Sequence, residues 1–200
     1  MDHYYSAMPD VASDPKSVRY RVLGMEFTCT TDSGVFCRDG LDMGTRVLLA
    51  ALPEALGDDI LDLGCGWGPV GVALGKKYPQ SRIVMSDVNA RAVALARQNC
   101  AANGVFNARP IVSDGFENIE GGFSAIVLNP PIRAGKAVVY SLFEQAKAHL
   151  KEGGALYIVM RKQQGAESAQ RYLQSLYGEV ERLARDKGYW VLRCRGGLEA

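Results

Sequence analysis

The sequence predicts an α/β domain with a seven-stranded, mostly parallel sheet, one antiparallel strand and helices on both faces. From residue 60 onward, short apolar segments alternate with segments of helical periodicity, which is the pattern of a parallel sheet covered on both sides. The segment 123–129 (FSAIVLN) is almost wholly apolar, as expected for a strand buried on both of its faces. A short β-hairpin is expected before this region.

The composition is that of an ordinary globular domain. The chain has 200 residues, of which 48% are hydrophobic and 22% are charged, and this excludes a disordered chain, a collagen-like chain and a disulfide scaffold. The net charge is only +1, so any contact with a nucleic acid must be local. The five cysteines form no CxxC pair and there are two histidines, so we predict no metal site.

Neither the N-terminal residues nor any apolar run predicts export or membrane insertion. The N-terminus (MDHYYSAMPD) lacks the apolar core of a signal peptide. No apolar run approaches the ~20 residues that a membrane span needs. We therefore expect a cytoplasmic protein with reduced thiols.

The first part of the chain predicts an arm, a hairpin and a loop. Residues 1–16 lack periodicity, whereas 17–23 and 26–31 alternate polar and apolar residues around Gly24. A polar loop follows, and apolar residues at helical spacing predict a helix over 41–56. We assign residues 1–40 to an arm, hairpin and substrate or cofactor loop that belong to the same domain as residues 41–200.

The middle of the chain predicts three strands and two helices. Pro69 suits the first turn of a helix, where its missing N–H is not needed. Asn89 is a helix N-cap and Gly104 ends that helix. The predicted strands are 60–65, 82–88 and 109–113, and the predicted helices are 69–77 and 89–103.

The last part predicts two further helices and the antiparallel strand. Gly153 and Gly154 are expected to close the first of these helices. Lys187-Gly188 is expected to form a hairpin turn between the final two strands. The predicted helices are 136–150 and 165–177, and the predicted strands after 123–129 are 155–161, 180–185 and 189–195.

A glycine-rich loop follows the strand at 60–65. Gly64, Gly66 and Gly68 stand at alternate positions between this strand and a helix, where backbone must turn tightly and approach a ligand. In a dinucleotide-binding loop the third glycine would stand at the position of Pro69, so a pyrophosphate is disfavoured. Asp62, just before the glycines, fits a cationic ligand without phosphates.

Two further aspartates end the next two strands. An acidic side chain at Asp87, 21 residues after Gly66, can accept hydrogen bonds from both ribose hydroxyls. Asp114 ends the third strand, where it could reach an adenine amino group. Together with the glycine loop, these residues predict a nucleoside pocket at the carboxyl edge of the sheet.

The strand at 123–129 ends in Asn129-Pro130-Pro131-Ile132. The prolines stop the strand, while the Asn129 carboxamide oxygen and the Pro130 carbonyl can both accept hydrogen bonds. Two such acceptors would grip a planar –NH2 group and orient its lone pair, which is catalysis by positioning without a strong base. We therefore predict Asn129, Pro130 and Pro131 as catalytic residues.

These motifs together resemble the class I S-adenosylmethionine-dependent methyltransferases, and NPP resembles the motif of the amino-methylating subgroup. Residues 34–44 (GVFCRDGLDMG) and 162–166 (KQQGA) are similar to the small-subunit ribosomal RNA guanine-N2 methyltransferases. The resemblance covers residues 17–195. It implies a Rossmann-like fold, S-adenosyl-L-methionine as cofactor with S-adenosyl-L-homocysteine as product, and RNA as partner.

The resemblance also assigns roles to residues. Phe36, Arg38 and Asp39 would form a lid over the cofactor and the target base, and Ile132 and Arg133 would contact substrate. Val88 would pack against the adenine, which Gly115 and Phe116 would flank. The cofactor-binding residues are thus predicted to be Asp62, Gly64, Cys65, Gly66, Trp67, Asp87, Val88, Asp114, Gly115, Phe116 and Asn129.

Two departures from the family pattern are visible. The position of Ile132 is commonly aromatic and gives a face on which a flipped base stacks. Guanine-N2 members often carry an additional N-terminal domain, whereas only an arm and hairpin precede the predicted sheet here. Four alternatives stay open: methylation of protein glutamine N5, methylation of DNA adenine N6, a nicotinamide-dependent oxidoreductase, and a cofactor-binding module without activity.

Overall fold

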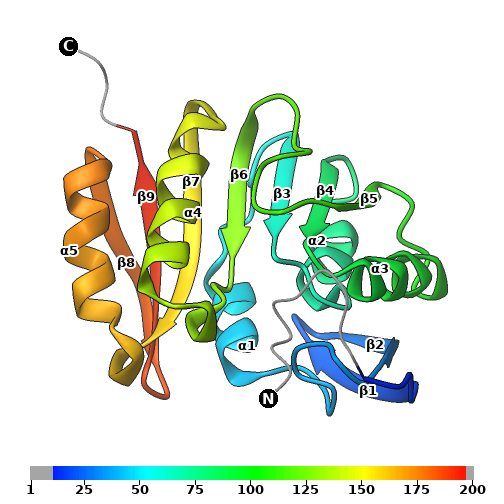
Figure 1. Ribbon diagram of the computed structural model, residues 1–200. Coiled ribbons are helices and arrows are strands. Elements are labelled where there is room, and N and C mark those ends of the chain that lie inside the picture. Colours follow the sequence, from blue (N-terminus) through cyan, green and yellow to red (C-terminus); the bar gives the residue numbers. More distant parts are fainter. Residues whose placement is uncertain (1–10, 197–200) are drawn as a thin grey trace.

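A computed structural model describes residues 11–196 and contains the predicted seven-stranded sheet (Figure 1). Its strand order is β5-β4-β3-β6-β7-β9-β8. β9 pairs antiparallel with both of its neighbours, so it is the single antiparallel strand, as predicted. The strands are β3 Asp59–Leu63, β4 Arg82–Asp87, β5 Ala108–Val112, β6 Phe123–Leu128, β7 Leu150–Arg161, β8 Glu179–Asp186 and β9 Tyr189–Arg195.

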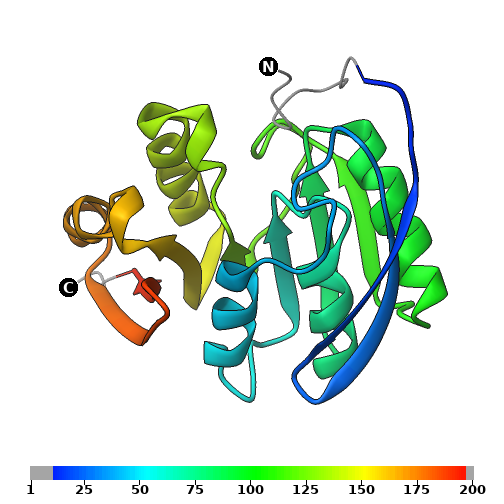
Figure 2. The same cartoon turned by 90° about the horizontal axis from the view of Figure 1, so that it is seen from below.

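Helices cover both faces of the sheet. α1 (Met43–Ala51), α2 (Pro69–Lys77) and α3 (Ala90–Ala102) contribute to one apolar core. α4 (Lys136–Ala148) and α5 (Ala166–Leu176) contribute to the other and lie across the sheet from α1 and α2 (Figure 2). β6 shows the consequence, because its alternate residues enter the two cores and all but one of its six side chains are buried.

The strand order reverses between β3 and β6. β4 and β5 extend the sheet on one side of this pair, and β7, β9 and β8 extend it on the other. Leu63 and Leu128 are paired at the ends of β3 and β6, so the glycine loop and Asn129 begin side by side. Ligands of open α/β sheets bind beyond the carboxyl ends of the strands at such a reversal.

The predicted hairpin is present and docks on α3. β1 (Lys16–Val22) and β2 (Met25–Thr31) are joined by a two-residue turn. The Asn99 and Asn103 carboxamides pair with the backbone N–H and C=O of Thr30 and Thr28, respectively. Asn99 and Asn103 are four residues apart on α3, which is a rise of about 6 Å. Thr28 and Thr30 are two residues apart on β2, which is a span of about 6.7 Å, so the spacing along the helix matches the spacing along the strand.

Loss of the Asn99 side chain should destabilise the protein more than loss of Asn103. Asn99 is 1% exposed and also donates to the Trp67 carbonyl, at 2.8 Å, whereas water can replace the contacts of Asn103 with β2. We expect Asn99→Ala to lower the free energy of unfolding by about 2–4 kcal/mol and Asn103→Ala by about 1 kcal/mol. Denaturant unfolding measures both values, and equal losses would contradict this account of the docking.

Two element predictions need correction. The helix predicted over 41–56 spans only Met43–Ala51, because the Asp42 carboxylate caps its start and the chain leaves the helix just before Pro53. The expected closure of α4 by Gly153 and Gly154 is wrong. α4 ends at Ala148, and both glycines lie within β7, where a Cβ on Gly154 would stand 2.8 Å from the Phe123 carbonyl oxygen.

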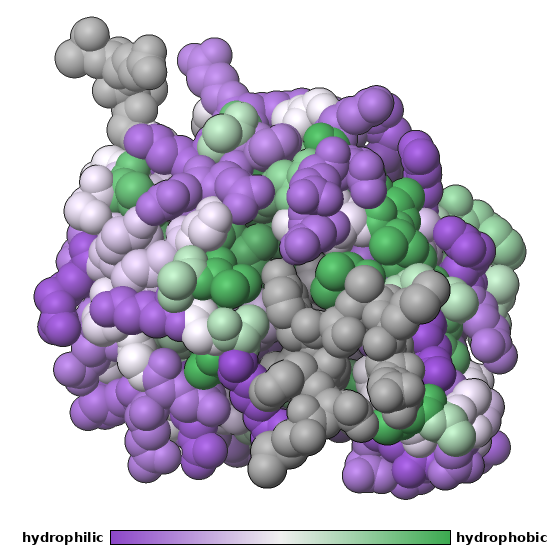
Figure 3. All heavy atoms as spheres, viewed as in Figure 1, coloured by the Kyte–Doolittle hydropathy of each residue, from purple (hydrophilic) through white to green (hydrophobic). Residues whose placement is uncertain are grey.

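The other predicted helices and strands are confirmed within two residues, except that β7 begins at Leu150 rather than at the predicted Ala155. Residues 1–10 of the predicted N-terminal arm lie outside the described residues. Asn89 caps α3 and Pro69 opens α2, as expected. The face shown in Figure 3 is mostly hydrophilic, with small apolar areas near its centre. Within residues 11–196, no helix has the length and apolar character that crossing a bilayer requires.

Candidate active site

A deep cavity opens at the carboxyl edge of the sheet, at the reversal between β3 and β6. It encloses about 970 Å³ of empty space, counting its open mouth. Its lining combines apolar side chains with a few carboxylate, amide and hydroxyl groups, as is typical of small-molecule sites. Its walls come from the loop after β3, the ends of β4 and β6, the turn after β5, and residues 35–45.

The glycine loop exposes its backbone to this cavity. Gly64 and Gly66 have φ values of +72° and +53°, which L side chains rarely adopt. A Cβ at either position would have no atom within 4 Å, so both glycines face open space. The amide of Cys65 donates to the Ser86 carbonyl at 2.8 Å, which ties the loop to the end of β4.

One carboxylate holds the glycine loop and a second holds the start of α2. Asp87 accepts hydrogen bonds from Gly66 N–H at 2.8 Å and from Asn89 N–H at 2.9 Å. These two bonds hold the carboxylate beside the glycine loop. Asp62 is 2% exposed and accepts from Gly71 N–H at 2.8 Å. Burial raises the pKa of both carboxyls, and that of Asp62 reaches about 7.

The raised pKa of Asp62 makes stability depend on pH. Asp62 titrates near 3.8 when exposed and near 7 in the folded protein, so the folded state binds more protons between these values. The free energy of unfolding therefore falls as the pH rises through this window. Asp62→Asn keeps an acceptor for Gly71 and removes the charge, so we expect its Tm to exceed that of the parent by about 3 °C or more at pH 8.

Thermal unfolding at two pH values tests this expectation. Near pH 4 the parent carboxyl is protonated in the folded state, so the advantage of Asp62→Asn should disappear there. A gain of equal size at both pH values, or a loss of stability at pH 8, would show that the charge of Asp62 is not what costs stability.

Asn129 follows β6, next to the strand that leads into the glycine loop, and lines the same cavity. Its side chain is held by residues at the start of α1. Its Nδ2 donates to Thr45 Oγ1 at 3.1 Å and lies 3.5 Å from Asp42 Oδ2. If the amide were flipped, its oxygen would face the Asp42 carboxylate, and the two negative groups would repel each other. The carboxylate therefore selects the orientation in which Nδ2 faces it. This leaves Oδ1 as the atom that can accept a hydrogen bond from a ligand amine.

The two prolines after Asn129 shape the same wall. The Pro130 carbonyl accepts a hydrogen bond from Ile132 N–H at 2.9 Å, and the Pro131 carbonyl accepts from Ala134 N–H at 2.9 Å. A carbonyl oxygen has two lone pairs, so Pro130 can still accept from a ligand. The turn leads into η1 (Ile132–Ala134) and then into α4.

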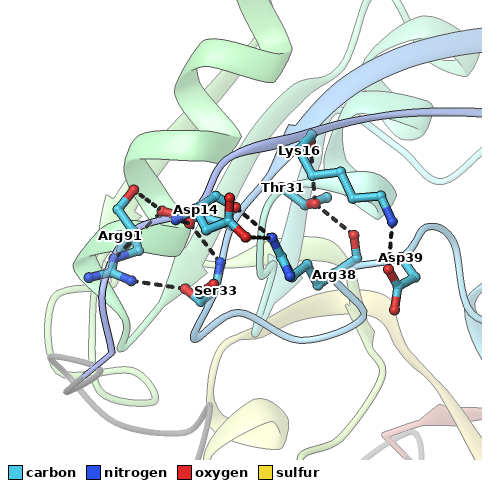
Figure 4. A network of polar contacts seen from close by, with 9 residues as sticks. Asp14, Lys16, Thr31, Ser33, Arg38, Asp39 and Arg91 are labelled. Atoms are coloured by element: carbon cyan, nitrogen blue, oxygen red, sulfur yellow. Dashed lines mark hydrogen bonds and ion pairs between the residues drawn. The ribbon is translucent and has the colours of Figure 1, made fainter.

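The loop between β2 and α1 covers the cavity and carries Phe36. Trp67 Nε1 donates to the Phe36 carbonyl at 2.9 Å, and Asn89 Nδ2 donates to the Gly34 carbonyl at 3.0 Å. Figure 4 shows how the N-terminal arm fastens this loop: Asp14 pairs with Arg38, and Lys16 pairs with Asp39 at 2.7 Å. Arg91 binds the Ser33 carbonyl from α3.

Most of the predicted site residues meet in the cavity, but six do not line it. Arg38 and Asp39 face the N-terminal arm, and Asp114 is exposed on the turn after β5. Phe116 is buried in the core and stacks on His149, with ring centroids 4.3 Å apart. Ile132 and Arg133 lie just outside the cavity, on η1. The predicted residues that line it are Phe36, Asp62, Gly64, Cys65, Gly66, Trp67, Asp87, Val88, Gly115, Asn129, Pro130 and Pro131.

Sequence reasoning missed Asp42, Thr45 and Ser86. Asp42 belongs to the segment 34–44 that carries the family resemblance, but nothing in the order of residues shows that it reaches Asn129, 87 positions later. Ser86 precedes Asp87 on β4 and lines the cavity. Its hydroxyl is buried and has no hydrogen-bond partner among the described residues.

Comparison with known proteins identifies the family. Residues 26–193 match the methyltransferase small domain family. The chain belongs to the methyltransferase small domain family. This confirms the predicted class I methyltransferase fold, and S-adenosyl-L-methionine is the cofactor of such enzymes, as predicted.

Relatives of this methyltransferase include proteins named for ribosomal RNA. The uncharacterized protein YbxB of Bacillus subtilis (strain 168) is 42% identical, and the match covers 97% of this chain and 98% of that protein. Ribosomal RNA large subunit methyltransferase G of Pseudomonas putida (strain W619) is 36% identical over 92% of this chain. The chain spans about half of that enzyme, since the match covers 50% of it.

Solved structures agree with this placement. The T. thermophilus 16S rRNA N2-guanine methyltransferase RsmC, solved with AdoMet and guanosine, superposes with a TM-score of 0.82 at 27% identity. The match covers 94% of this chain and 52% of RsmC. A ribosomal protein L11 methylase from Lactobacillus delbrueckii matches with a TM-score of 0.65 and 18% identity over 81% of each chain, which shows a shared fold alone.

Proposed function

We propose that this methyltransferase transfers a methyl group from S-adenosyl-L-methionine to the exocyclic N2 of guanine in ribosomal RNA. The observation that carries the proposal is the position of Asn129. Asn129 lines the same cavity as the glycine loop, and its carboxamide oxygen is free to accept a hydrogen bond there while its NH2 group donates to Thr45. An acceptor held there suits a ligand that presents an amine.

The residues of the cavity fit the cofactor. The Asp87 carboxylate lies beside the glycine loop and is held there by two backbone N–H groups. Ribose hydroxyls can donate hydrogen bonds to it at this position. The open backbone of Gly64 and Gly66 leaves room for the methionine part. Bound there, the cofactor supplies an electrophilic methyl group on a sulfonium centre.

The chain's own residues prepare the amine for attack. The guanine N2 lone pair is delocalised into the ring, so the amino group is a weak nucleophile. Hydrogen bonds from its two N–H groups to Asn129 Oδ1 and the Pro130 carbonyl would hold it with its lone pair toward the methyl group. Such orientation and electrostatic stabilisation replace a strong base.

Guanine is favoured over the other amines by the relatives. RsmC, at a TM-score of 0.82, was solved with guanosine, and two of the named relatives act on ribosomal RNA. Phe36 lines the cavity and provides an aromatic face at a site where Ile132 provides none. We infer that the flipped guanine stacks on Phe36. A ribosomal substrate also agrees with the predicted cytoplasmic location.

Transfer of labelled methyl groups tests the proposal. Ribosomal subunits and naked ribosomal RNA from cells lacking this protein would be incubated with purified enzyme and labelled S-adenosyl-L-methionine. We expect label in N2-methylguanosine after nuclease digestion, and the small-subunit RNA is the substrate that the sequence predicts. Label in protein glutamine or in N6-methyladenosine would overturn the choice of substrate. Binding of the cofactor with no transfer to any of these would favour a binding module.

A further inference from the structure

We propose that Asp42 and Thr45 form a positioning relay that orients the amide of Asn129 and polarises its oxygen. This inference rests on the proposed function, in which Asn129 Oδ1 receives the substrate amine. Three side chains from two distant parts of the chain carry it. Asp42 and Thr45 belong to the start of α1, and Asn129 follows β6.

The hydrogen bonds of the relay have a fixed direction. The Thr45 hydroxyl donates to Asp42 Oδ2 at 2.5 Å, which uses its only proton. Its oxygen therefore remains an acceptor, and Asn129 Nδ2 donates to it at 3.1 Å. The chain of hydrogen bonds thus joins the Asp42 carboxylate, the Thr45 hydroxyl and the NH2 group of Asn129. The Asn129 amide oxygen takes no part in this chain.

Each partner is itself held in place. Asp42 Oδ1 accepts from Thr45 N–H at 3.1 Å, since Asp42 is the N-cap of α1. Thr45 is 2% exposed and cannot exchange its partners freely with water. A β-branched side chain also has restricted χ1 rotation, so the hydroxyl remains aimed at Asn129.

The relay has two chemical consequences. It excludes the flipped amide, in which Nδ2 would face the substrate amine and donor would meet donor. It also draws positive charge toward the NH2 end of the amide, because Asp42 is anionic, and so increases the negative charge on Oδ1. Hydrogen bonds polarise one another in this way along a chain. Both effects act on the reacting amine through Asn129, without touching it.

Isosteric loss of the Thr45 hydroxyl tests the relay. Thr45→Val retains shape and β-branching but can neither donate to Asp42 nor accept from Asn129. We expect kcat to fall about 10- to 100-fold, because a misplaced group costs rate on this scale. The KM for S-adenosyl-L-methionine and its calorimetric Kd should change less than about threefold. Thr45→Ser should recover most of the lost rate, since it restores the hydroxyl.

A double-mutant cycle separates positioning from a general structural role. In an Asn129→Ala background, Thr45→Val should cause no further loss of kcat, because the relay then has nothing to orient. Thr28→Val, an exposed threonine on β2 outside the cavity, is the matched control and should leave kcat unchanged. Asp42→Asn retains a good N-cap and removes the charge, so it should preserve Tm and lower kcat.

Three outcomes would overturn the relay. Additive losses in the double mutant would mean that Thr45 does not act through Asn129. A large rise in the Kd for S-adenosyl-L-methionine with unchanged kcat would mean that Thr45 binds the cofactor. Full activity of Thr45→Val would mean that Asn129 needs no positioning. Failure of Asn129→Ala to lower the rate would instead count against the proposed function, so the two failures are distinguishable.

Discussion

Asn129→Ala is expected to lower kcat by a factor on the order of 10² or more. The variant loses the acceptor that holds the substrate amine, and water in its place would not be oriented by Thr45. In the proposed binding mode the cofactor contacts Asp87 and the glycine loop, which line the cavity with Asn129, so its affinity should change little. Steady-state kinetics with labelled S-adenosyl-L-methionine and calorimetry measure the two effects separately.

Asn107→Ala is the matched control for this variant. Asn107 precedes β5 at the opposite edge of the sheet, where Nδ2 donates to the Tyr78 and Ser81 carbonyls, at 3.1 and 2.9 Å. It should reduce stability without reducing kcat of the folded protein. If Asn129→Ala transferred methyl groups as fast as the parent, Asn129 would have no part in the reaction.

Asp87→Ala is expected to weaken cofactor binding on the order of 10²-fold, with a smaller effect on kcat at saturation. Two hydrogen bonds from ribose hydroxyls to a carboxylate contribute about 1.5–3 kcal/mol each. Asp87 also accepts from Gly66 N–H, so the loop loses one of its supports. Titration calorimetry with S-adenosyl-L-homocysteine gives the affinity directly.

The effect of Asp87 should be specific to its position. Asp58 is an exposed aspartate just before β3, at the amino edge, so Asp58→Ala removes an equal charge far from the cavity and should leave the Kd unchanged. A Kd for Asp87→Ala within threefold of the parent value would show that the ribose binds elsewhere. Affinity lost equally in both variants would point to net charge rather than to a contact.

The sequence predicted the elements that carry the cavity because their patterns are local. The short apolar segment before the glycines predicts a buried strand. A proline at the start of α2 and two prolines after β6 restrict the backbone within a few residues. Since parallel strands end at one edge, the glycine loop, Asp87 and Asn129 could be placed together from strand order alone. The structure confirms that they line one cavity.

What the sequence did not predict depends on contacts between distant residues. Asp42 and Asn129 are 87 positions apart in the sequence, and no pattern of polar and apolar residues predicts that they are in contact. Arg38 and Asp39 were expected over the substrate, but ion pairs with Asp14 and Lys16 turn them toward the arm. The helix predicted over 41–56 was too long, because its apolar pattern continues past the point where Pro53 excludes a helix.

A crystal structure with S-adenosyl-L-homocysteine and guanosine tests the central claim most directly. We expect the cofactor sulfur next to Gly64 and Gly66, with its ribose hydroxyls on Asp87. We also expect guanine N2 within about 3 Å of Asn129 Oδ1, a hydrogen-bond distance. A guanine whose amino group points away from Asn129, or a cofactor bound outside the glycine loop, would contradict the account.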